Sequence, residues 1–287
     1  MTSVLVTGKD SQLAQCIDKI TPQYPNFNFI FKSSIDLDIT NISEVNTLFT
    51  DLKGIDYCIN CAAYTAVDNA EVEIEKAYNV NYKGVKNLAE ACLKNQVKLV
   101  HISTDFLFDG TASKPYSENN VVNPINVYGK TKLKGEQAIE NFLNDYFIIR
   151  TSWLYSEYGH NFLKTMLNLS AKRKELSIVN DQIGSPTYAG NLAEVILTLI
   201  GNEKVSSGIY HYSNSGIASW YDFAHEILKL NASGIKLNKI RTKDYPTLAI
   251  RPKYSVLDTT KIKNMLEIKI PNWKHSLAIA FKNLNSN

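Results

Sequence analysis

The sequence predicts an α/β protein: a Rossmann-like, doubly wound parallel sheet with a smaller C-terminal α+β lobe. Three observations lead to this fold class. Strand-like and helix-like segments alternate through the first half of the chain, the alternation loosens after Tyr155, and the 287 residues are 44% hydrophobic and 21% charged. Strict alternation is typical of a parallel sheet with helices on both faces, and this length allows a large core.

The elements of the first half follow one another in a regular order. Strands are expected where apolar runs are rich in β-branched and aromatic residues, in SVLVTG, FNFIF, DYCINCA, KLVHIST and YFIIRTSWLY. Helices are expected where apolar residues recur with a period of about 3.6, in QLAQCIDKI, SEVNTLFTDL, residues 75–94 and residues 130–143. We therefore expect residues 1–155 to form a first domain.

Beyond residue 155 the segments NFLKTMLNLSAKR, LSIVN, LAEVILTLI and GIYHYSN still alternate, and the remainder is helical and rich in loops. We expect residues 188–214 to rejoin the first domain, and residues 156–187 and 215–287 to form the smaller, substrate-binding lobe. The chain has no Ser/Gly-rich linker, so the two lobes are expected to pack without a flexible hinge.

Composition excludes several classes of function. A net charge of +3 without a long basic run argues against nucleic acid as a partner, and no apolar stretch approaches the ~20 residues of a membrane span. The first residues do not resemble a signal peptide. Cys58 and Cys61 form a C-x-x-C inside an apolar run, which favours buried structural thiols over a redox or zinc site. We expect a cytoplasmic protein.

The end of the first strand carries a candidate phosphate-binding turn, VTGKDSQLA. Ligands of open α/β sheets bind beyond the carboxyl ends of the strands. A dinucleotide turn normally has three glycines, and here only Gly8 is present, with Ser11 and Ala14 at the other two positions. Ala14 still allows close helix packing, and the Ser11 hydroxyl is able to cap the helix or to bind phosphate. Gly8 and Ser11 are the predicted phosphate contacts of this turn.

The end of the second strand bears on the choice of nicotinamide cofactor. An acidic residue there would bind the ribose hydroxyls of NAD, whereas FNFIF runs into Lys32, Ser33 and Ser34. A lysine suits the 2′-phosphate of NADPH, so we predict NADPH, with NADH as the alternative. Lys32 also has a simpler interpretation, as a solvated surface lysine.

Tyr128 and Lys132 form the candidate catalytic pair. Four residues apart on a helix, their side chains lie on one face, about 5–6 Å apart at Cβ. An ammonium beside a phenol lowers its pKa, so the phenol can exchange a proton with a carbinol oxygen. The fourth strand ends at Thr104, whose hydroxyl would reach the same oxygen. We predict that Thr104, Tyr128 and Lys132 act on a carbonyl beside a nicotinamide.

These segments resemble the extended short-chain dehydrogenase/reductases, and among them the dTDP-4-dehydrorhamnose reductase family. The similarity runs nearly end to end. It is carried by NCAAYTAVDNAE at 60–71, NVNYKG at 79–84, STDFLFDG at 103–110, NVYGKTKLKGE at 126–136, RTSWLY at 150–155, GHNFLKTM at 159–166, NDQIGSPTY at 180–188 and RPKYSVLD at 251–258.

The resemblance implies roles for further residues. It makes Thr104, Tyr128 and Lys132 the catalytic triad, with Tyr128 and Lys132 also at the cofactor. Additional cofactor contacts would be Asp10, Gln12 and Leu13 at the pyrophosphate turn, Asp38 and Ile39 near the adenine, and Ala62, Ala63 and Tyr64 along the cofactor. The substrate would contact Thr104, Asp105, Trp153, Asp68, Asn161 and Arg251. Trp153 could equally be core packing, and Arg251 could meet a diphosphate or pair with a carboxylate in the small lobe.

The chain departs from the family pattern in two places. The glycine turn is incomplete, which puts cofactor affinity in doubt. Some relatives dimerise through a magnesium ion held by carboxylates, and the matching positions here carry Gln15 and Gly190. We therefore predict no metal site, and the protein is expected to be a monomer or a homodimer.

The activity implied is NADPH- or NADH-dependent reduction of the C4 keto group of dTDP-4-dehydro-β-L-rhamnose to dTDP-L-rhamnose. Two alternatives remain. A reductase of a different nucleotide-linked 4-ketosugar would have the same catalytic residues, because specificity lies in the variable small lobe. A non-catalytic regulatory subunit of the methionine adenosyltransferase type would bind the cofactor without turnover. The intact Thr104, Tyr128 and Lys132, with no extra N-terminal segment, argue against this alternative.

Overall fold

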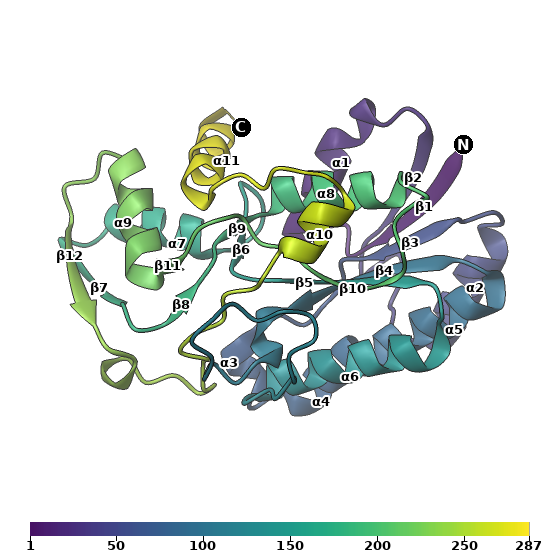
Figure 1. Ribbon diagram of the computed structural model, residues 1–287, viewed down its shortest axis with the longest axis horizontal. Helices are drawn as coiled ribbons and strands as arrows, with labels where there is room; N and C mark the ends of the chain where they lie inside the picture. Colours follow the sequence, from purple (N-terminus) through teal and green to yellow (C-terminus); the bar gives the residue numbers. More distant parts are fainter. Residues whose placement is uncertain (287) are drawn as a thin grey trace.

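The computed structural model describes residues 1–286, which form two lobes lying side by side (Figure 1). The larger lobe is built on a six-stranded sheet in which every neighbouring pair is parallel, in the order β10-β5-β4-β3-β1-β2. Its strands are β1 (Thr2–Thr7), β2 (Phe27–Lys32), β3 (Tyr57–Asn60), β4 (Lys98–Thr104), β5 (Tyr146–Thr151) and β10 (Gly208–His211). The predicted doubly wound α/β fold class is thereby confirmed.

Helices cover both faces of this sheet because the strands are apolar on both faces. Val4 and Val6 of β1 point to the face covered by α1 (Gln12–Ile20) and α8 (Ala189–Ile200), whereas Leu5 points to the opposite face. That second face is covered by α2 (Ile42–Asp51), α5 (Val85–Asn95) and α6 (Val127–Phe142). The two apolar layers hold the sheet in place and fix which edge its carboxyl ends share.

The predicted helix over residues 75–94 is interrupted. It consists of α4 (Ile74–Tyr78), a π-helical turn (Asn79–Gly84) and α5, with a short helix α3 (Val67–Ala70) before it. The π-helical turn packs against α6. A side chain at Gly135 of α6 would place its Cβ 2.3 Å from the Asn81 carbonyl oxygen, so only glycine permits this approach. π-Bulges of this kind are frequent at functional sites.

The smaller lobe packs three helices against an aromatic core. The core includes Tyr155, Phe223 and Trp273, and the helices are α7 (Phe162–Ser170), α9 (Trp220–Leu230) and α11 (Trp273–Ser286). The remaining strands form two-stranded sheets, β6 (Leu154–Tyr155) with β9 (Thr187–Tyr188), β7 (Glu175–Val179) with β12 (Lys236–Ile240), and β8 (Ile183–Gly184) with β11 (Ala218–Ser219).

The lobes are interleaved along the chain. Helix α8 and strand β10 belong to the large lobe. Helix α10 (Thr260–Met265) also belongs to it, because this helix packs beside β10 and contributes Ile262 to the same core. Figure 1 shows α10 close to α8 and apart from α7 and α9. Residues 260–270, assigned by the sequence to the small lobe, thus contact the large one, and the division of the chain into domains stays a prediction.

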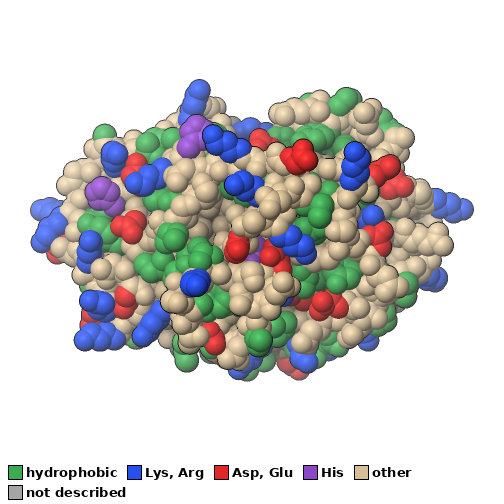
Figure 2. Space-filling view, viewed as in Figure 1, with side chains coloured by type: hydrophobic (Ala, Val, Ile, Leu, Met, Phe, Trp, Pro, Cys, Tyr) green, Lys and Arg blue, Asp and Glu red, His purple; other side chains and the backbone are tan. Residues whose placement is uncertain are grey.

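The surface has charges of both signs. On the face shown in Figure 2, Lys and Arg side chains are interspersed with Asp and Glu and with apolar side chains. Within residues 1–286, every helix is too short or too polar to cross a membrane.

A buried ion pair joins α6 to the sheet. The Arg150 guanidinium of β5 donates to both carboxylate oxygens of Glu136, from Nε at 3.0 and 3.2 Å and from a terminal nitrogen at 2.7 Å. Arg150 also lies 3.4 Å from Nε2 of His211, whose Nδ1 is 3.0 Å from the Tyr116 carbonyl oxygen. Burial, and then the charge of Arg150, lower the pKa of His211 to about 3, so this imidazole is neutral.

We predict that Glu136→Gln destabilises the protein by about 3–5 kcal/mol, because it leaves the Arg150 guanidinium buried without its counter-charge. Urea unfolding followed by circular dichroism measures the free energy of unfolding. The double variant Glu136→Leu/Arg150→Met removes both charges and is expected to recover most of the loss. A single variant as stable as the original protein would contradict the role of the pair.

Candidate active site

The carboxyl ends of β1, β3 and β4 bring the predicted turn to one edge of the sheet. Gly8 has a positive φ of 68°, and a Cβ at this position would lie 2.7 Å from the backbone nitrogen of Ala62. Glycine is therefore required by both conformation and space. The Ser11 hydroxyl caps α1 by accepting from the Ala14 backbone nitrogen at 3.2 Å. The first turn of α1 thus presents free N–H groups and the positive end of the helix dipole.

Three predicted contacts in this turn have other partners. Leu13 is buried in the core, so its side chain does not face the edge of the sheet. The Asp10 carbonyl oxygen accepts from the Gln15 amide at 2.9 Å. Gln12 Oε1 accepts from Asn161 at 2.8 Å and from the Ser156 hydroxyl at 3.2 Å. The side chain of Gln12 therefore connects the turn to the start of α7 in the small lobe.

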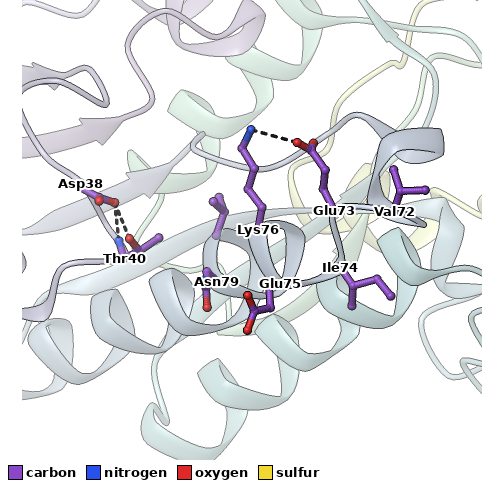
Figure 3. A pocket seen from close by; sticks show the side chains of 9 residues that line it. Asp38, Thr40, Val72, Glu73, Ile74, Glu75, Lys76 and Asn79 are labelled. Atoms are coloured by element: carbon purple, nitrogen blue, oxygen red, sulfur yellow. Dashed lines mark hydrogen bonds and ion pairs between the residues drawn. The ribbon is translucent and has the colours of Figure 1, made fainter.

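The ends of β2 and of the segment after it lie on the same edge. Lys32 is half-buried, and its carbonyl oxygen accepts from the Lys9 backbone nitrogen at 3.0 Å. The Asp38 carboxylate accepts hydrogen bonds from the backbone nitrogen and the hydroxyl of Thr40. Both residues line a shallow groove with residues 72–76, 79 and 80 (Figure 3). Ile39 is buried beneath Gly84, so only its backbone is available to a ligand in the groove.

The segment after β3 is held by two asparagine side chains. Asn60 Oδ1 accepts from the Ala62 backbone nitrogen at 3.1 Å. Asn81 of the π-helical turn binds both backbone groups of Tyr64, accepting from its nitrogen at 2.9 Å and donating to its oxygen at 3.0 Å. The Tyr64 hydroxyl donates to Glu73. Residues 62–64 are thus fixed in place beside the phosphate turn.

Thr104 and Tyr128 are brought together, as the sequence predicted. Thr104 is the last residue of β4, and Tyr128 lies in the first turn of α6, with its ring edge-on to Phe106 at 5.6 Å between centroids. Burial raises the pKa of Tyr128 to about 12, while a hydrogen bond with Thr104 lowers it and the Asp105 carboxylate raises it. Tyr128 is therefore a protonated phenol at neutral pH.

The Lys132 amine contacts β4 in this structure, and its expected tuning of Tyr128 stays a prediction. The Lys132 amine lies 2.6 Å from the Ile102 carbonyl oxygen and 3.1 Å from Nε2 of His101. A buried amine in the low-dielectric core binds the nearest strong acceptors, and these belong to β4. Burial lowers the pKa of Lys132 to about 8, and no effect of Lys132 on Tyr128 appears among residues 1–286.

Asp105 follows Thr104 and is fully buried. Its Oδ1 accepts from the Thr104 hydroxyl at 3.2 Å, and its Oδ2 has no partner among residues 1–286. Burial raises the pKa of Asp105 to about 7, against the lowering effect of hydrogen bonds with Ser255 and Thr104. Two neighbouring hydroxyls, of Ser103 and Thr151, also lack partners within the described chain. Unpaired buried polar atoms at one edge indicate a place for a polar ligand.

The predicted substrate residues of the small lobe mostly contact one another or the large lobe. Arg251 forms a two-pronged ion pair with Asp68 of α3, at 3.0 and 2.6 Å, so its carboxylate partner lies in the large lobe and not, as predicted, in the small lobe. Trp153 stacks on Trp220 with 3.6 Å between ring centroids and has a positive φ of 46°. Asn161 caps α7 and donates to Gln12. Their roles toward a substrate stay predictions.

Several residues at this edge were missed by the sequence analysis: Asn60, Asn81, His101, Glu136 and Ser255. Asn60 and His101 stand in register on adjacent strands, and a polar residue inside each of two apolar strand segments is the signal that could have found them. Gly190 stands where some relatives carry a carboxylate that binds magnesium, and the structure gives a packing reason for glycine at this position. A Cβ at this position would lie 2.4 Å from the Tyr188 ring, so the ring occupies the space of a side chain.

A nicotinamide dinucleotide fits the residues present. Gly8 supplies a close backbone approach at the start of α1, and Lys32 ends the neighbouring strand on the same edge. The unpaired Ser103, Asp105 and Thr151 side chains lie at the carboxyl ends of β4 and β5. These features provide a phosphate-binding helix terminus and, beside Tyr128, polar groups for a sugar or a carboxamide.

Comparison with known proteins identifies the family of this chain. The family model described as RmlD substrate binding domain matches residues 1–286. A protein of Aggregatibacter actinomycetemcomitans named dTDP-4-dehydrorhamnose reductase is 40% identical, covering 96% of this chain and 97% of its own length. A solved dTDP-4-dehydrorhamnose reductase from Clostridium acetobutylicum is 41% identical with a TM-score of 0.94, over 99% of this chain and 100% of that one.

A further solved structure, of dTDP-4-dehydrorhamnose reductase from Bacillus anthracis in complex with NADP, is 38% identical with a TM-score of 0.94, over 99% of this chain and 100% of that one. Family model, sequence identity and fold therefore agree over nearly the whole length. The chain belongs to the dTDP-4-dehydrorhamnose reductase family.

Proposed function

We propose that this protein reduces the C4 keto group of dTDP-4-dehydro-β-L-rhamnose to give dTDP-L-rhamnose, with NADPH as the preferred reductant. The observation that carries the proposal is the meeting of the Thr104 hydroxyl and the Tyr128 phenol at the sheet edge that also holds the Gly8 turn. Relatives about 40% identical over the whole chain are named for this activity. We expect the enzyme to act in the cytoplasm as a monomer or a homodimer.

The chemistry follows from the protonation states in the site. When bound, the nicotinamide cofactor supplies the hydride that reduces the ketone carbon. Negative charge then develops on the ketone oxygen, and Tyr128, held protonated by burial, is placed to donate its proton to that oxygen. Thr104 now donates to Asp105 and would turn its hydroxyl to the same oxygen. Two donors from adjacent elements thus stabilise one developing alkoxide.

The preference for NADPH rests on Lys32. This lysine ends the second strand, where an acidic residue would favour NAD, and Ser33 and Ser34 follow it. A 2′-phosphate beside an ammonium gains a charge-assisted hydrogen bond that the unphosphorylated ribose does not make.

Tyr128→Phe tests the acid. The variant keeps the ring packing on Phe106 and removes the proton donor, so kcat is expected to fall by about 10²–10⁴-fold while NADPH affinity is unchanged. Turnover is followed by nicotinamide absorbance with dTDP-4-dehydrorhamnose, and cofactor binding by fluorescence titration. Tyr57→Phe, at the amino end of β3, is the matched control and should leave kcat intact. Equal kcat for Tyr128→Phe and the original protein would remove Tyr128 from the mechanism.

Thr104→Val and Thr104→Ser separate the hydroxyl from the shape of its side chain. Valine removes one donor to the ketone oxygen, so kcat should drop by roughly 10²-fold, whereas serine should retain most of the activity. The nicotinamide absorbance assay measures kcat for both variants. Equal loss of activity in the serine and valine variants would show that the hydroxyl is not the important group.

Lys32→Ala tests the cofactor. Loss of the ammonium is expected to weaken NADPH binding about tenfold, or ~1.4 kcal/mol, and to leave NADH binding unchanged. Lys53→Ala, in the loop before β3 at the opposite end of the sheet, serves as the control. Equal losses for NADPH and NADH would contradict a 2′-phosphate contact.

A panel of dTDP- and UDP-linked 4-ketosugars tests the substrate. The highest kcat/KM is expected for dTDP-4-dehydro-β-L-rhamnose. A higher value for another ketosugar would favour the alternative reductase, and NADPH binding without turnover of any sugar would favour a regulatory subunit.

A further inference from the structure

A row of buried polar side chains crosses the sheet just below the candidate site. Thr7 of β1, Asn60 of β3 and His101 of β4 are direct register partners on three adjacent strands, and each is at most 1% exposed. All three lie on the face of the sheet covered by α5 and α6, because Leu5, Cys58 and Leu99, two residues before them, pack in that core. Lys132 of α6 ends the row, 3.1 Å from His101.

The direction of each hydrogen bond in the row can be assigned from Asn60. A backbone N–H only donates, so the Ala62 nitrogen at 3.1 Å identifies its partner as the Asn60 carbonyl oxygen. The Thr7 hydroxyl donates to the same oxygen at 2.7 Å. The Asn60 amide nitrogen therefore faces His101 Nδ1, at 3.1 Å, and donates to it. His101 Nδ1 must be the unprotonated nitrogen.

The tautomer of His101 follows. Complete burial and then the charge of Lys132 lower the pKa of His101 well below its usual value, so the ring is neutral and has a single N–H. With Nδ1 accepting, that N–H is on Nε2, which points at the Lys132 nitrogen. An ammonium has three donors and no acceptor, so it would meet another donor here. Only the neutral amine can accept from His101 while donating to the Ile102 carbonyl oxygen.

No counter-charge compensates for an ammonium at this position. Lys132 is 2% exposed and makes no ion pair in the described part of the chain. Glu136, one turn further along α6, raises the pKa of Lys132, but its two oxygens are engaged by Arg150. Two ion pairs on neighbouring elements are formed without Lys132, between Lys76 and Glu73 and between Lys86 and Glu90.

The Asp105 carboxylate raises the pKa of Tyr128, and neither group is among those that shift the pKa of Lys132. Burial lowers the pKa of Lys132 to about 8, against the raising effect of Glu136. A hydrogen bond that only the neutral amine can accept lowers it further.

We propose that His101 is a positioning residue that, fixed as its Nε2–H tautomer by Asn60, donates to Lys132 and stabilises it as a neutral amine turned away from Tyr128. Lys132 has to take up a proton and exchange its partners before it can support Tyr128 or a ribose hydroxyl. This last step rests on the proposed function, whereas the tautomer and the neutral amine do not.

The first test reads the protons directly. Nitrogen-15 NMR of the full chain, without added cofactor at about pH 8, distinguishes protonated from unprotonated imidazole nitrogens. We expect Nε2 of His101 to be protonated and Nδ1 to be unprotonated. Lysine labelled with carbon-13 at Cε, with Lys132→Arg for assignment, should show one lysine that titrates at or below about pH 8. An Nδ1–H tautomer, an imidazolium, or a Lys132 that titrates with the other lysines would overturn the proposal.

Two variants of the row test the cause. Asn60→Asp still accepts from Ala62 and Thr7 but can no longer donate to His101, so the tautomer should switch to Nδ1–H and the pKa of Lys132 should rise by more than about one unit. Because the new carboxylate also raises that pKa by its charge, the tautomer is the decisive reading. Thr7→Val removes one hydrogen bond but leaves Ala62 to orient Asn60, and should change neither. A switch of tautomer in Thr7→Val would contradict the assignment of the hydrogen bonds. If Asn60→Asp does not fold, the NMR spectrum of the unsubstituted protein still tests the tautomer of His101.

The second test concerns cofactor binding. Calorimetric titration with NADPH, in two buffers of different ionisation enthalpy, counts protons taken up. Uptake of roughly one proton is expected at about pH 9 and much less at about pH 6, where Lys132 is already charged. In Asn60→Asp the uptake at the higher pH should fall by about half or more, because more of Lys132 is already charged before NADPH binds. NADPH binding with no proton uptake would overturn the partner exchange, while a failure of NADPH to bind would defeat the proposed function and leave the NMR result to judge the tautomer.

Discussion

The site depends on the hydrogen-bonded registration of β4 between β3 and β5. Because side chains alternate along a strand, β4 presents Leu99, His101 and Ser103 to one face and ends at Thr104, and its neighbours place Asn60 beside His101 and Thr151 beside Thr104. A slip of one residue would move His101 into the apolar layer under α1 and α8. Registration of a single strand therefore determines both the groups that face a ketone and those that hold Lys132.

Much of the fold could be predicted because its apolar layers impose clear periods. The strand KLVHIST coincides with β4, and FNFIF with most of β2. The predicted strand 146–155 is broken at Ser152 and Trp153, where a positive φ diverts the chain into the small lobe. Helix 75–94 was predicted without its π-helical turn, because an apolar period near 3.6 does not register one extra residue per turn. The interleaving of α10 with the large lobe depends on long-range packing and leaves no local pattern.

The candidate site was predictable in its residues and less so in its contacts. Spacing and strand position were enough to bring Thr104 next to Tyr128, since both follow from regular elements. The orientation of Lys132 was not predictable, because a long side chain chooses among acceptors that only the folded sheet assembles. The same holds for Arg251, whose partner Asp68 is 183 residues away in the chain. Tyr128 is consequently protonated through burial, where spacing alone suggested an activated phenolate.

Two histidines are buried as neutral rings, His101 within the polar row and His211 against Arg150. In the unfolded chain both would titrate near ~6.5, whereas burial lowers the pKa of His211 to about 3 and that of His101 well below its usual value. Between those values the unfolded chain binds more protons, so acid drives unfolding as pH falls below about 6.5. The polar framework under the site thereby couples the stability of the whole molecule to pH, because protons taken up by the two histidines of the unfolded chain favour unfolding in acid.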